Sequence, residues 1–198
     1  MKILAFSDLH AAPSRAQALV DAAQEADLVL GAGDFCNHRG GLAEALALLD
    51  GITAPRVFVP GNHESAQELA AVAKPGVTVL HGAGCEVGGL RIFGLGYGVP
   101  VTPFGDWSCD MTEEMAETKL AACAEADILL LHSPPKGLGD VTGQGQSVGS
   151  VAIRDAITRL QPRLALCGHI HDSWGIRGRI GETELVNLGP VPNWFHLE

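Results

Sequence analysis

Seven side chains of the types that bind metal ions stand directly after short apolar segments of this 198-residue chain. Two aspartates, one asparagine and four histidines offer a mixed set of oxygen and nitrogen donors. Such a set suits Mn²⁺, Fe, Zn²⁺, Co²⁺ or Ni²⁺ better than Mg²⁺ or Ca²⁺ alone. We therefore expect a centre for divalent metal ions, with Mn²⁺ as the first candidate. The candidate ligands are Asp8, His10, Asp34, Asn62, His132, His169 and His171.

The spacing of these residues also suits a shared centre. Asp8 and His10 are two positions apart, and so are His169 and His171. In an extended chain, side chains at positions i and i+2 point the same way, so both members of each pair can face one ion. A glycine precedes three of the ligands, where it permits a positive φ and a close approach of the backbone. These glycines are Gly33, Gly61 and Gly168.

Each of these motifs is weak when taken alone. A single histidine at a strand end is more often a hydrogen-bonded structural residue. Gly33-Asp34 is compatible with an ordinary turn, and Asn62-His63 is compatible with a turn followed by a helix cap. Five such motifs, each directly after an apolar segment, are much harder to explain as unrelated structural features. Their combination favours one convergent site.

The apolar segments have the lengths and composition of strands. In the first half we expect strands at 2–6, 27–30 and 56–59 that alternate with helices at 14–25, 42–49 and 64–73. This β-α-β-α-β-α order implies parallel strands joined by helical crossovers. Sites in open α/β sheets form at the carboxyl ends of such strands, which is where the candidate ligands stand.

The second half mixes short strands with helices. We expect two sheets with helices outside them, in a single domain that spans residues 1–198. A long glycine-rich loop at 133–149 is a candidate functional segment because such loops are uncommon in compact domains. The expected strands are 77–80, 85–87, 90–95, 128–131 and 164–167, with helices at 112–125 and 151–160 and further strands after Trp174.

Composition limits the class of protein. Hydrophobic residues at 46% and charged residues at 18% are typical of a globular chain. No apolar run is long enough to span a membrane, and the first apolar segment is too short for a signal peptide, so we expect a cytoplasmic protein. Five cysteines without a C-x-x-C pair argue against disulfides or a thiolate zinc site. The net charge of −10 argues against a nucleic-acid polymer as partner.

The five motifs, in this order, resemble the calcineurin-like metallophosphoesterase superfamily. They are Asp8-Leu9-His10, Gly33-Asp34, Gly61-Asn62-His63-Glu64, His132 and Gly168-His169-Ile170-His171. The segment His132–Gly137, together with Asp140, is similar to the His-x-Pro-Pro-x-Gly motif of a subgroup of small phosphodiesterases that includes enzymes acting on cyclic nucleotides.

The resemblance implies a fold and a set of roles. The family fold is a four-layer α/β/β/α sandwich of two mixed sheets, the metallo-dependent phosphatase fold. By similarity, His63 is not a ligand but a catalytic residue that faces the phosphate and, as imidazolium, assists the leaving oxygen. One metal ion would be bound by Asp8, His10, Asp34 and His171, and a second by Asp34, Asn62, His132 and His169.

The expected reaction is hydrolysis of a phosphodiester of small-molecule size by a hydroxide that two metal ions activate. A phosphomonoesterase or a protein Ser/Thr phosphatase is the alternative enzyme. Arg39, a candidate phosphate contact, belongs to a near-match to the protein phosphatase motif, in which Asn37 replaces an aspartate. A non-enzymatic scaffold of the same fold is the alternative outside enzymes. The natural substrate, the native metal and the oligomeric state stay open.

Overall fold

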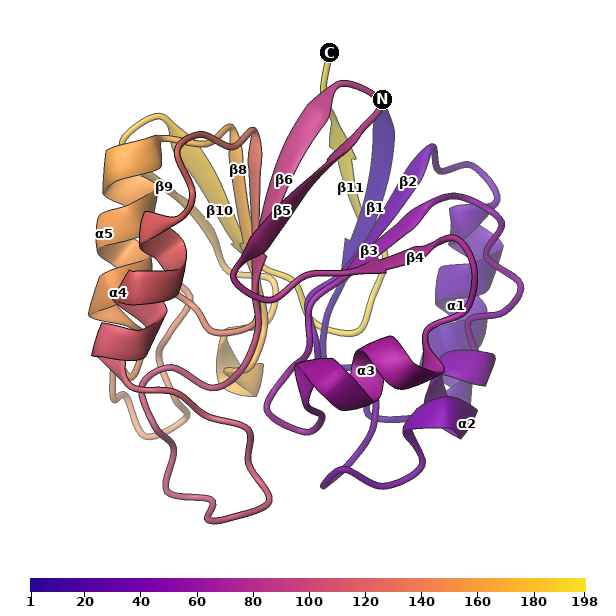
Figure 1. Ribbon diagram of the computed structural model, residues 1–198, viewed down its shortest axis with the longest axis horizontal. Coiled ribbons are helices and arrows are strands. Elements are labelled where there is room, and N and C mark those ends of the chain that lie inside the picture. Colours follow the sequence, from indigo (N-terminus) through magenta and orange to yellow (C-terminus); the bar gives the residue numbers. More distant parts are fainter.

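Two β-sheets face each other and carry helices on their outer surfaces in the computed structural model, which describes all 198 residues (Figure 1). The strand order is β11-β1-β2-β3-β4 in the first sheet and β5-β6-β7-β8-β10-β9 in the second. The first sheet comprises β1 (Lys2–Phe6), β2 (Leu28–Gly31), β3 (Arg56–Phe58), β4 (Val77–Val79) and β11 (Asn193–His196). The second comprises β5 (Ala83–Val87), β6 (Leu90–Leu95), β7 (Ile128–Leu131), β8 (Leu164–Cys167), β9 (Arg177–Ile180) and β10 (Thr183–Asn187).

The helices cover opposite sides of this pair of sheets. The first sheet is covered by α1 (Pro13–Ala23), α2 (Leu42–Ala47) and α3 (Ala66–Val72), and the second by α4 (Glu113–Ala121) and α5 (Val151–Leu160). Strands β1 to β4 are parallel and β11 is antiparallel to them. In the second sheet β6, β7, β8 and β10 are parallel, with antiparallel β5 and β9 at the edges. The predicted α/β fold of two mixed sheets is confirmed.

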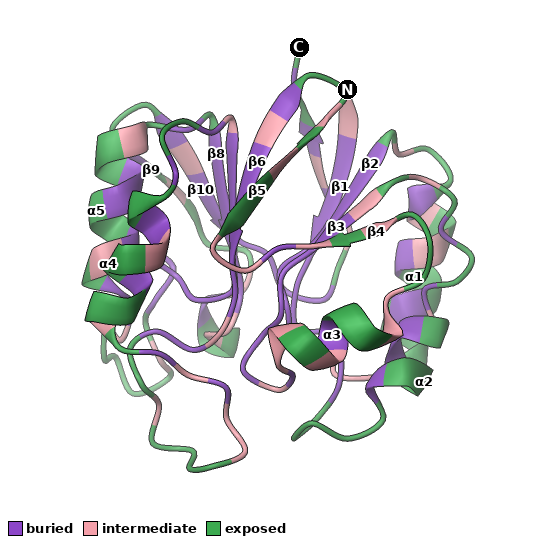
Figure 2. Cartoon of the chain, in the orientation of Figure 1, coloured by how far each residue is buried: buried purple, intermediate pink, exposed green.

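The period-two pattern of the strands separates three hydrophobic cores. Ile3 and Ala5 of β1 point between the sheets, whereas Leu4 and Phe6 point toward the helices of the first layer. Strand β7 divides in the same way, because Leu130 faces the other sheet and its neighbours face α4 and α5. Figure 2 shows the result, in which the strands are largely buried and the helices expose their outer faces. Alternating apolar residues on both strand faces therefore build the four layers.

Three of the five α-helices begin with a side-chain cap, and α1 and α2 do not. Thr112 caps α4 by accepting a hydrogen bond from the backbone N–H of Met115, and Ser65 with Glu68 forms a capping box at α3. The N-cap residue of α1 is Ala12, whose side chain cannot accept a hydrogen bond. Pro13 already occupies the first turn, where its fixed φ suits the helix and its missing N–H costs nothing. None of the helices has the length and apolarity that a membrane crossing needs.

The strands that precede the candidate ligands end level with one another. Phe6, Gly31 and Phe58 lie side by side in register at the ends of β1, β2 and β3. In the facing sheet Leu130 of β7 is in register with Leu166 of β8. Parallel strands that end together direct the following turns to a single edge of both sheets.

Candidate metal centre

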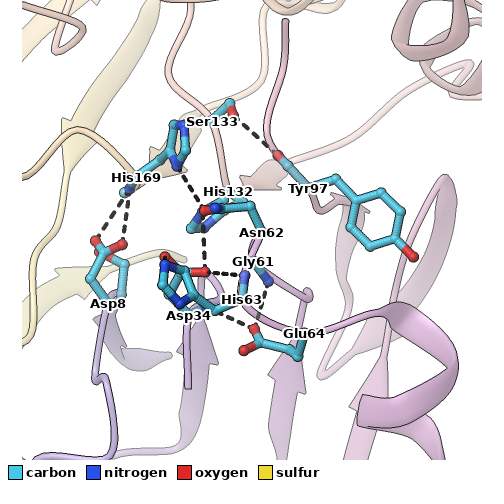
Figure 3. A network of polar contacts seen from close by, with 12 residues as sticks. Asp8, Asp34, Gly61, Asn62, His63, Glu64, Tyr97, His132, Ser133 and His169 are labelled. Carbon is cyan, nitrogen blue, oxygen red and sulfur yellow. Dashed lines mark hydrogen bonds and ion pairs between the residues drawn. The ribbon is translucent and has the colours of Figure 1, made fainter. Parts of the chain in front are cut away.

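All seven candidate ligands meet at this edge, where they form two overlapping groups. The outer subsite consists of Asp8, His10, Asp34 and His171, and the inner subsite of Asp34, Asn62, His132 and His169. The donor atoms of the Asp and His members lie within 4.8 Å of one another in each group, and Asp34 belongs to both. Figure 3 shows how residues from the two sheets converge. Their assignment as ligands stays a prediction.

In the outer subsite two imidazole nitrogens face each other. Nε2 of His10 lies 3.2 Å from Nε2 of His171 and 3.7 Å from Oδ2 of Asp34. Nε2 of His171 lies 3.8 Å from Oδ1 of Asp8. His171 is the most exposed member, with 49% of its side chain accessible, whereas Asp8 is fully buried.

In the inner subsite two histidines approach one amide oxygen. Oδ1 of Asn62 lies 3.2 Å from Nε2 of His132 and 3.1 Å from Nδ1 of His169. Nε2 of His132 is also 3.5 Å from Oδ1 of Asp34. Asn62 holds its orientation because its amide N–H donates to the hydroxyl of Ser108, in the loop that follows β6.

Hydrogen bonds to residues outside the two subsites fix which ring nitrogen of His132 and of His10 faces the centre. Nδ1–H of His132 donates to the carbonyl of Ala32 at 2.7 Å, which leaves Nε2 unprotonated in the neutral ring. Nδ1–H of His10 donates to Oδ1 of Asn37 at 3.0 Å and to the carbonyl of Cys36. Metal-binding histidines are typically oriented in this way. Asn37, where the motif of the protein phosphatases has aspartate, therefore orients a candidate ligand.

Asp8 is held by three donors. The hydroxyl of Ser7 donates to Oδ2 at 2.5 Å, the indole N–H of Trp174 donates to the same oxygen at 2.9 Å, and the backbone N–H of His169 contacts both oxygens. Trp174 also packs on the ring of His171, with ring centroids 4.3 Å apart. The sequence left the role of Trp174 open, because its distance from Asp8 along the chain is 166 residues.

Glu64 ties two of the ligand turns together. Its buried carboxylate accepts backbone N–H bonds from Asp34, Phe35 and Cys36 after β2 and from Gly61 after β3. Burial raises the pKa of Glu64 to about 7, an effect that nearby Asp34 adds to and these N–H bonds oppose. Glu64 neither caps α3 nor orients His63, because Ser65 caps that helix and Nδ1 of His63 accepts the backbone N–H of His38.

The backbone at the ligands departs from the extended conformation that the spacing suggested. Four of the candidate ligands have φ between 49° and 68°, a region that residues other than glycine rarely adopt. They are Asp8, His10, Asp34 and His169. The i and i+2 argument therefore gave the right neighbours for the wrong reason. The close approach expected at glycine is present, since a Cβ on Gly61 would lie 2.0 Å from Oδ1 of Asp34.

His63 lies beside the centre and is fixed by its neighbours. Its Nδ1 accepts the backbone N–H of His38 at 2.9 Å, and its Nε2 lies 3.8 Å from Oδ2 of Asp34. Burial, together with the neighbouring histidines, lowers the pKa of His63 to about 3. Both observations favour a neutral ring with the proton on Nε2, directed at the centre. Trp107 packs against His63, with ring centroids 4.6 Å apart.

The charges of the cluster suit divalent cations. Burial and the adjacent Asp8 raise the pKa of Asp34 well above its usual range, while burial lowers the pKa of His169. Burial thus disfavours both the ionised carboxylate of Asp34 and the protonated imidazole of His169. Cations placed among these groups stabilise the carboxylate and bind neutral imidazole, so the donor set fits a metal centre.

Residues 1–173 match the sequence profile of the family described as Calcineurin-like phosphoesterase. The chain belongs to the calcineurin-like phosphoesterase family. The predicted family is confirmed, and membership implies a hydrolase of phosphoric esters that uses a dinuclear centre of divalent metal ions.

Several known proteins are similar to the chain. The human "Metallophosphoesterase domain-containing protein 1" is 34% identical over 133 residues, which is 65% of this chain and 38% of that protein. A structure of the protein TT1561 from Thermus thermophilus superposes with a TM-score of 0.77 at 20% identity, covering 95% of this chain and 88% of the other. An archaeal phosphodiesterase superposes with a TM-score of 0.55 at 14% identity over 96% and 84%. The matched stretches cover 26% to 74% of the curated relatives.

Arg39, the predicted phosphate contact, lies near the candidate metal centre, but its side chain points elsewhere. Its guanidinium donates two hydrogen bonds to Oε1 of Glu68, at 2.7 and 3.1 Å. Only its backbone N–H approaches the site, by donating to the carbonyl of His63. The structure thus brings His63 and the seven candidate ligands together, and directs the side chain of Arg39 to helix α3.

Proposed function

We propose that the protein hydrolyses phosphodiesters of small-molecule size, with two divalent cations bound in the outer and inner subsites and Mn²⁺ as the first candidate. The observation that supports this most strongly is the sharing of Asp34 between two four-residue ligand sets. A single structural ion would need only one such set. A shared carboxylate between two sets suits a pair of ions that act on one phosphate.

The residues of the chain have separate tasks in this reaction. The outer and inner subsites would hold two divalent cations, which would supply water activation and neutralisation of charge on the phosphoryl oxygens. Nε2–H of His63 donates a hydrogen bond to the leaving oxygen. Nδ1 of His63 accepts the backbone N–H of His38, so the proton of the neutral His63 ring is on Nε2. Trp107 excludes water from one side of His63. No covalent phosphoenzyme is expected.

The preference for diesters rests on the segment His132–Gly137 and what it builds. Asp140 accepts the backbone N–H groups of Gly137 and Gly149 and the hydroxyl of Ser147, all through Oδ2. The loop 133–149 is thereby folded into a wall beside the centre. Such a wall suits a substrate with organic groups on the phosphate. The preference for diesters also agrees with the resemblance of this segment to the small phosphodiesterases.

The test compares bis-p-nitrophenyl phosphate with p-nitrophenyl phosphate, after removal of metals and addition of Mn²⁺. We expect diester cleavage that requires Mn²⁺. Asp34→Ala should abolish it and lose both ions, since Asp34 serves both subsites. His63→Ala should retain the ions and lose about 10²–10⁴-fold in rate, the usual contribution of a positioned acid.

Other outcomes would support other functions. Cleavage of the monoester alone would favour a phosphomonoesterase. Absence of hydrolysis and of bound metal, with Mn²⁺ or any other ion of the expected set, would favour a protein-binding scaffold. The folded ligand cluster counts against the scaffold, because a scaffold has no need of His63 or of two complete subsites.

A further inference from the structure

A second cavity adjoins the candidate metal centre. It has a volume of about 650 Å³, within the range that holds organic ligands of moderate size. Much of its wall is apolar, and the loop after β6 supplies most of that surface. The apolar lining includes Val99, Pro100, Val101, Pro103, Val148 and Ile170. Four of them belong to the loop that connects β6 to α4, which extends below the sheets in Figure 1.

The cavity shares part of its lining with the space at the candidate metal centre. That space, of about 250 Å³, is lined by Asp34, Asn62 and His63. Four residues line both spaces, namely Phe104, Thr142, His169 and Ile170. His169 is a predicted ligand of the inner subsite. A group attached to a phosphate at the centre can therefore extend into the larger cavity past Phe104 without leaving the protein surface.

The lining of the cavity carries one carboxylate and one ammonium, and both are held by hydrogen bonds within the protein. Its carboxylate, Glu113, accepts hydrogen bonds from the hydroxyl of Ser150 and from two backbone N–H groups at the start of α5. Its ammonium, Lys136, donates to the carbonyl of Ser147 at 2.5 Å. Because these two charges are of opposite sign and much of the remaining wall is apolar, a charged arm would be desolvated with little compensation.

Three of the seven exposed large hydrophobic side chains of the protein line the cavity, namely Val101, Phe104 and Val151. Val101 is 59% exposed and Phe104 is 51% exposed. The Phe104 ring stacks on Trp107 with an interplanar angle of 12°. Trp107 in turn packs on His63, so a continuous aromatic surface leads from the candidate catalytic residue to the mouth of the cavity. Planar rings stack favourably on such a surface.

We propose that this cavity binds an uncharged organic arm of the phosphoester that bears a planar aromatic or heteroaromatic ring. This inference rests on the proposed function, because it requires the phosphate to occupy the metal centre. It adds a substrate class: phosphoesters with a flat, uncharged arm are preferred over those with short alkyl arms.

Binding of phosphonates tests the substrate class without relying on hydrolysis, since their P–C bond is not cleaved by ester hydrolysis. Calorimetric titration of the Mn²⁺-loaded protein would compare methylphosphonate, octylphosphonate and (naphthylmethyl)phosphonate. We expect the naphthylmethyl compound to bind at least about tenfold more tightly than either of the others, as an aromatic contact and apolar burial together allow.

A matched pair of variants locates the arm. Val101→Asp places a charge in the cavity, and Val191→Asp places one at an equally exposed valine outside it, at 54% exposure. Val101→Asp should reduce the preference for the naphthylmethyl over the methyl compound by about tenfold. Val191→Asp should leave that preference unchanged.

Each other result would overturn the inference. Equal binding of methyl and naphthylmethyl compounds, or an equal response of both variants, would remove the arm from this cavity while the metal centre stands. Equally tight binding of octylphosphonate would contradict the planar ring. Failure of all three phosphonates to bind would contradict phosphate binding at the centre, and the proposed function would fail with it.

Discussion

The outer and inner candidate subsites share Asp34 but differ in how firmly their other members are held. The inner subsite is almost fully enclosed, since Asn62 and His132 are buried and each makes a hydrogen bond to a second residue that fixes its orientation. The outer subsite includes His171, which is half exposed and restrained chiefly by packing against Trp174. A preorganised, enclosed set binds an ion at lower entropic cost than a set with a mobile member.

This difference predicts two ions of unequal affinity. We expect the inner ion to be retained on dialysis and the outer ion to exchange. Substrate phosphate would then reach a centre in which one cation is permanent and the other depends on supply. The predictions that follow test this inequality in order of decreasing effect.

The largest effect should come from removing one histidine of each subsite. His132→Ala should lose the inner ion and reduce kcat/KM on the order of 10³-fold, because it leaves an enclosed polar cavity without its ligand. His171→Ala should lose only the outer ion, on the order of 10²-fold, and excess Mn²⁺ should restore part of the activity. Metal content after dialysis and activity against Mn²⁺ concentration measure both.

His196→Ala is the control for this pair, because His196 is exposed on β11 and belongs to neither subsite. It should leave metal content and activity unchanged. If His132→Ala and His171→Ala lost the same ion, the two subsites would not be separate. If excess Mn²⁺ rescued His132→Ala better than His171→Ala, the inner ion would be the weaker one.

The next effect concerns Glu64, which joins the turns after β2 and β3. In Glu64→Gln one side-chain oxygen is replaced by an amide N–H₂ group that opposes the backbone N–H groups of Phe35 and Cys36. Leaving these buried donors unpaired should lower the free energy of unfolding by about 2 kcal/mol. Thermal unfolding of the metal-free protein measures it, with the exposed Glu86→Gln as control. An unchanged melting temperature would show that Glu64 does not join the two turns.

The strand ends could be predicted from sequence because apolar segments are local features. The segments 2–6, 90–95, 128–131 and 164–167, together with the ligands that follow several of them, are readable from residue type and spacing alone. The contacts that orient the ligands were not readable. Trp174 meets Asp8 and Glu64 meets Asp34 only after the chain has folded, and nothing in the local sequence distinguishes these residues from ordinary tryptophans and glutamates.

Trp174→Phe should produce an effect on the outer ion alone. Phenylalanine retains a ring against His171 but loses the indole N–H that donates to Oδ2 of Asp8. Loss of such an orienting hydrogen bond typically weakens metal affinity by about 10- to 100-fold, and we expect the lower value because Ser7 still donates to Asp8. Calorimetric titration with Mn²⁺ should show the weaker site shifted and the tighter site unchanged.

Trp194→Phe is the matched control. Trp194 lies on β11, where the ammonium of Lys2 on β1 packs over its ring, and it makes no contact with the subsites. If Trp174→Phe lowered the binding affinity of both ions, Asp8 would influence the inner subsite as strongly as the outer one. The distinction between the two subsites would then lose its physical basis.

The smallest effect is expected at Arg39, even though its sequence context suggested a phosphate contact. Its guanidinium is paired with Glu68 and both side chains are 39% exposed, a setting in which an ion pair contributes at most about 1 kcal/mol. Glu68 keeps its capping-box contact with Ser65 when the arginine is removed. Arg39→Ala should therefore change kcat/KM for the diester by less than about twofold, because the phosphate is bound by the two subsites. A rise in KM of about tenfold or more with kcat unchanged would instead place Arg39 on the substrate, which requires its side chain to leave Glu68 when substrate binds.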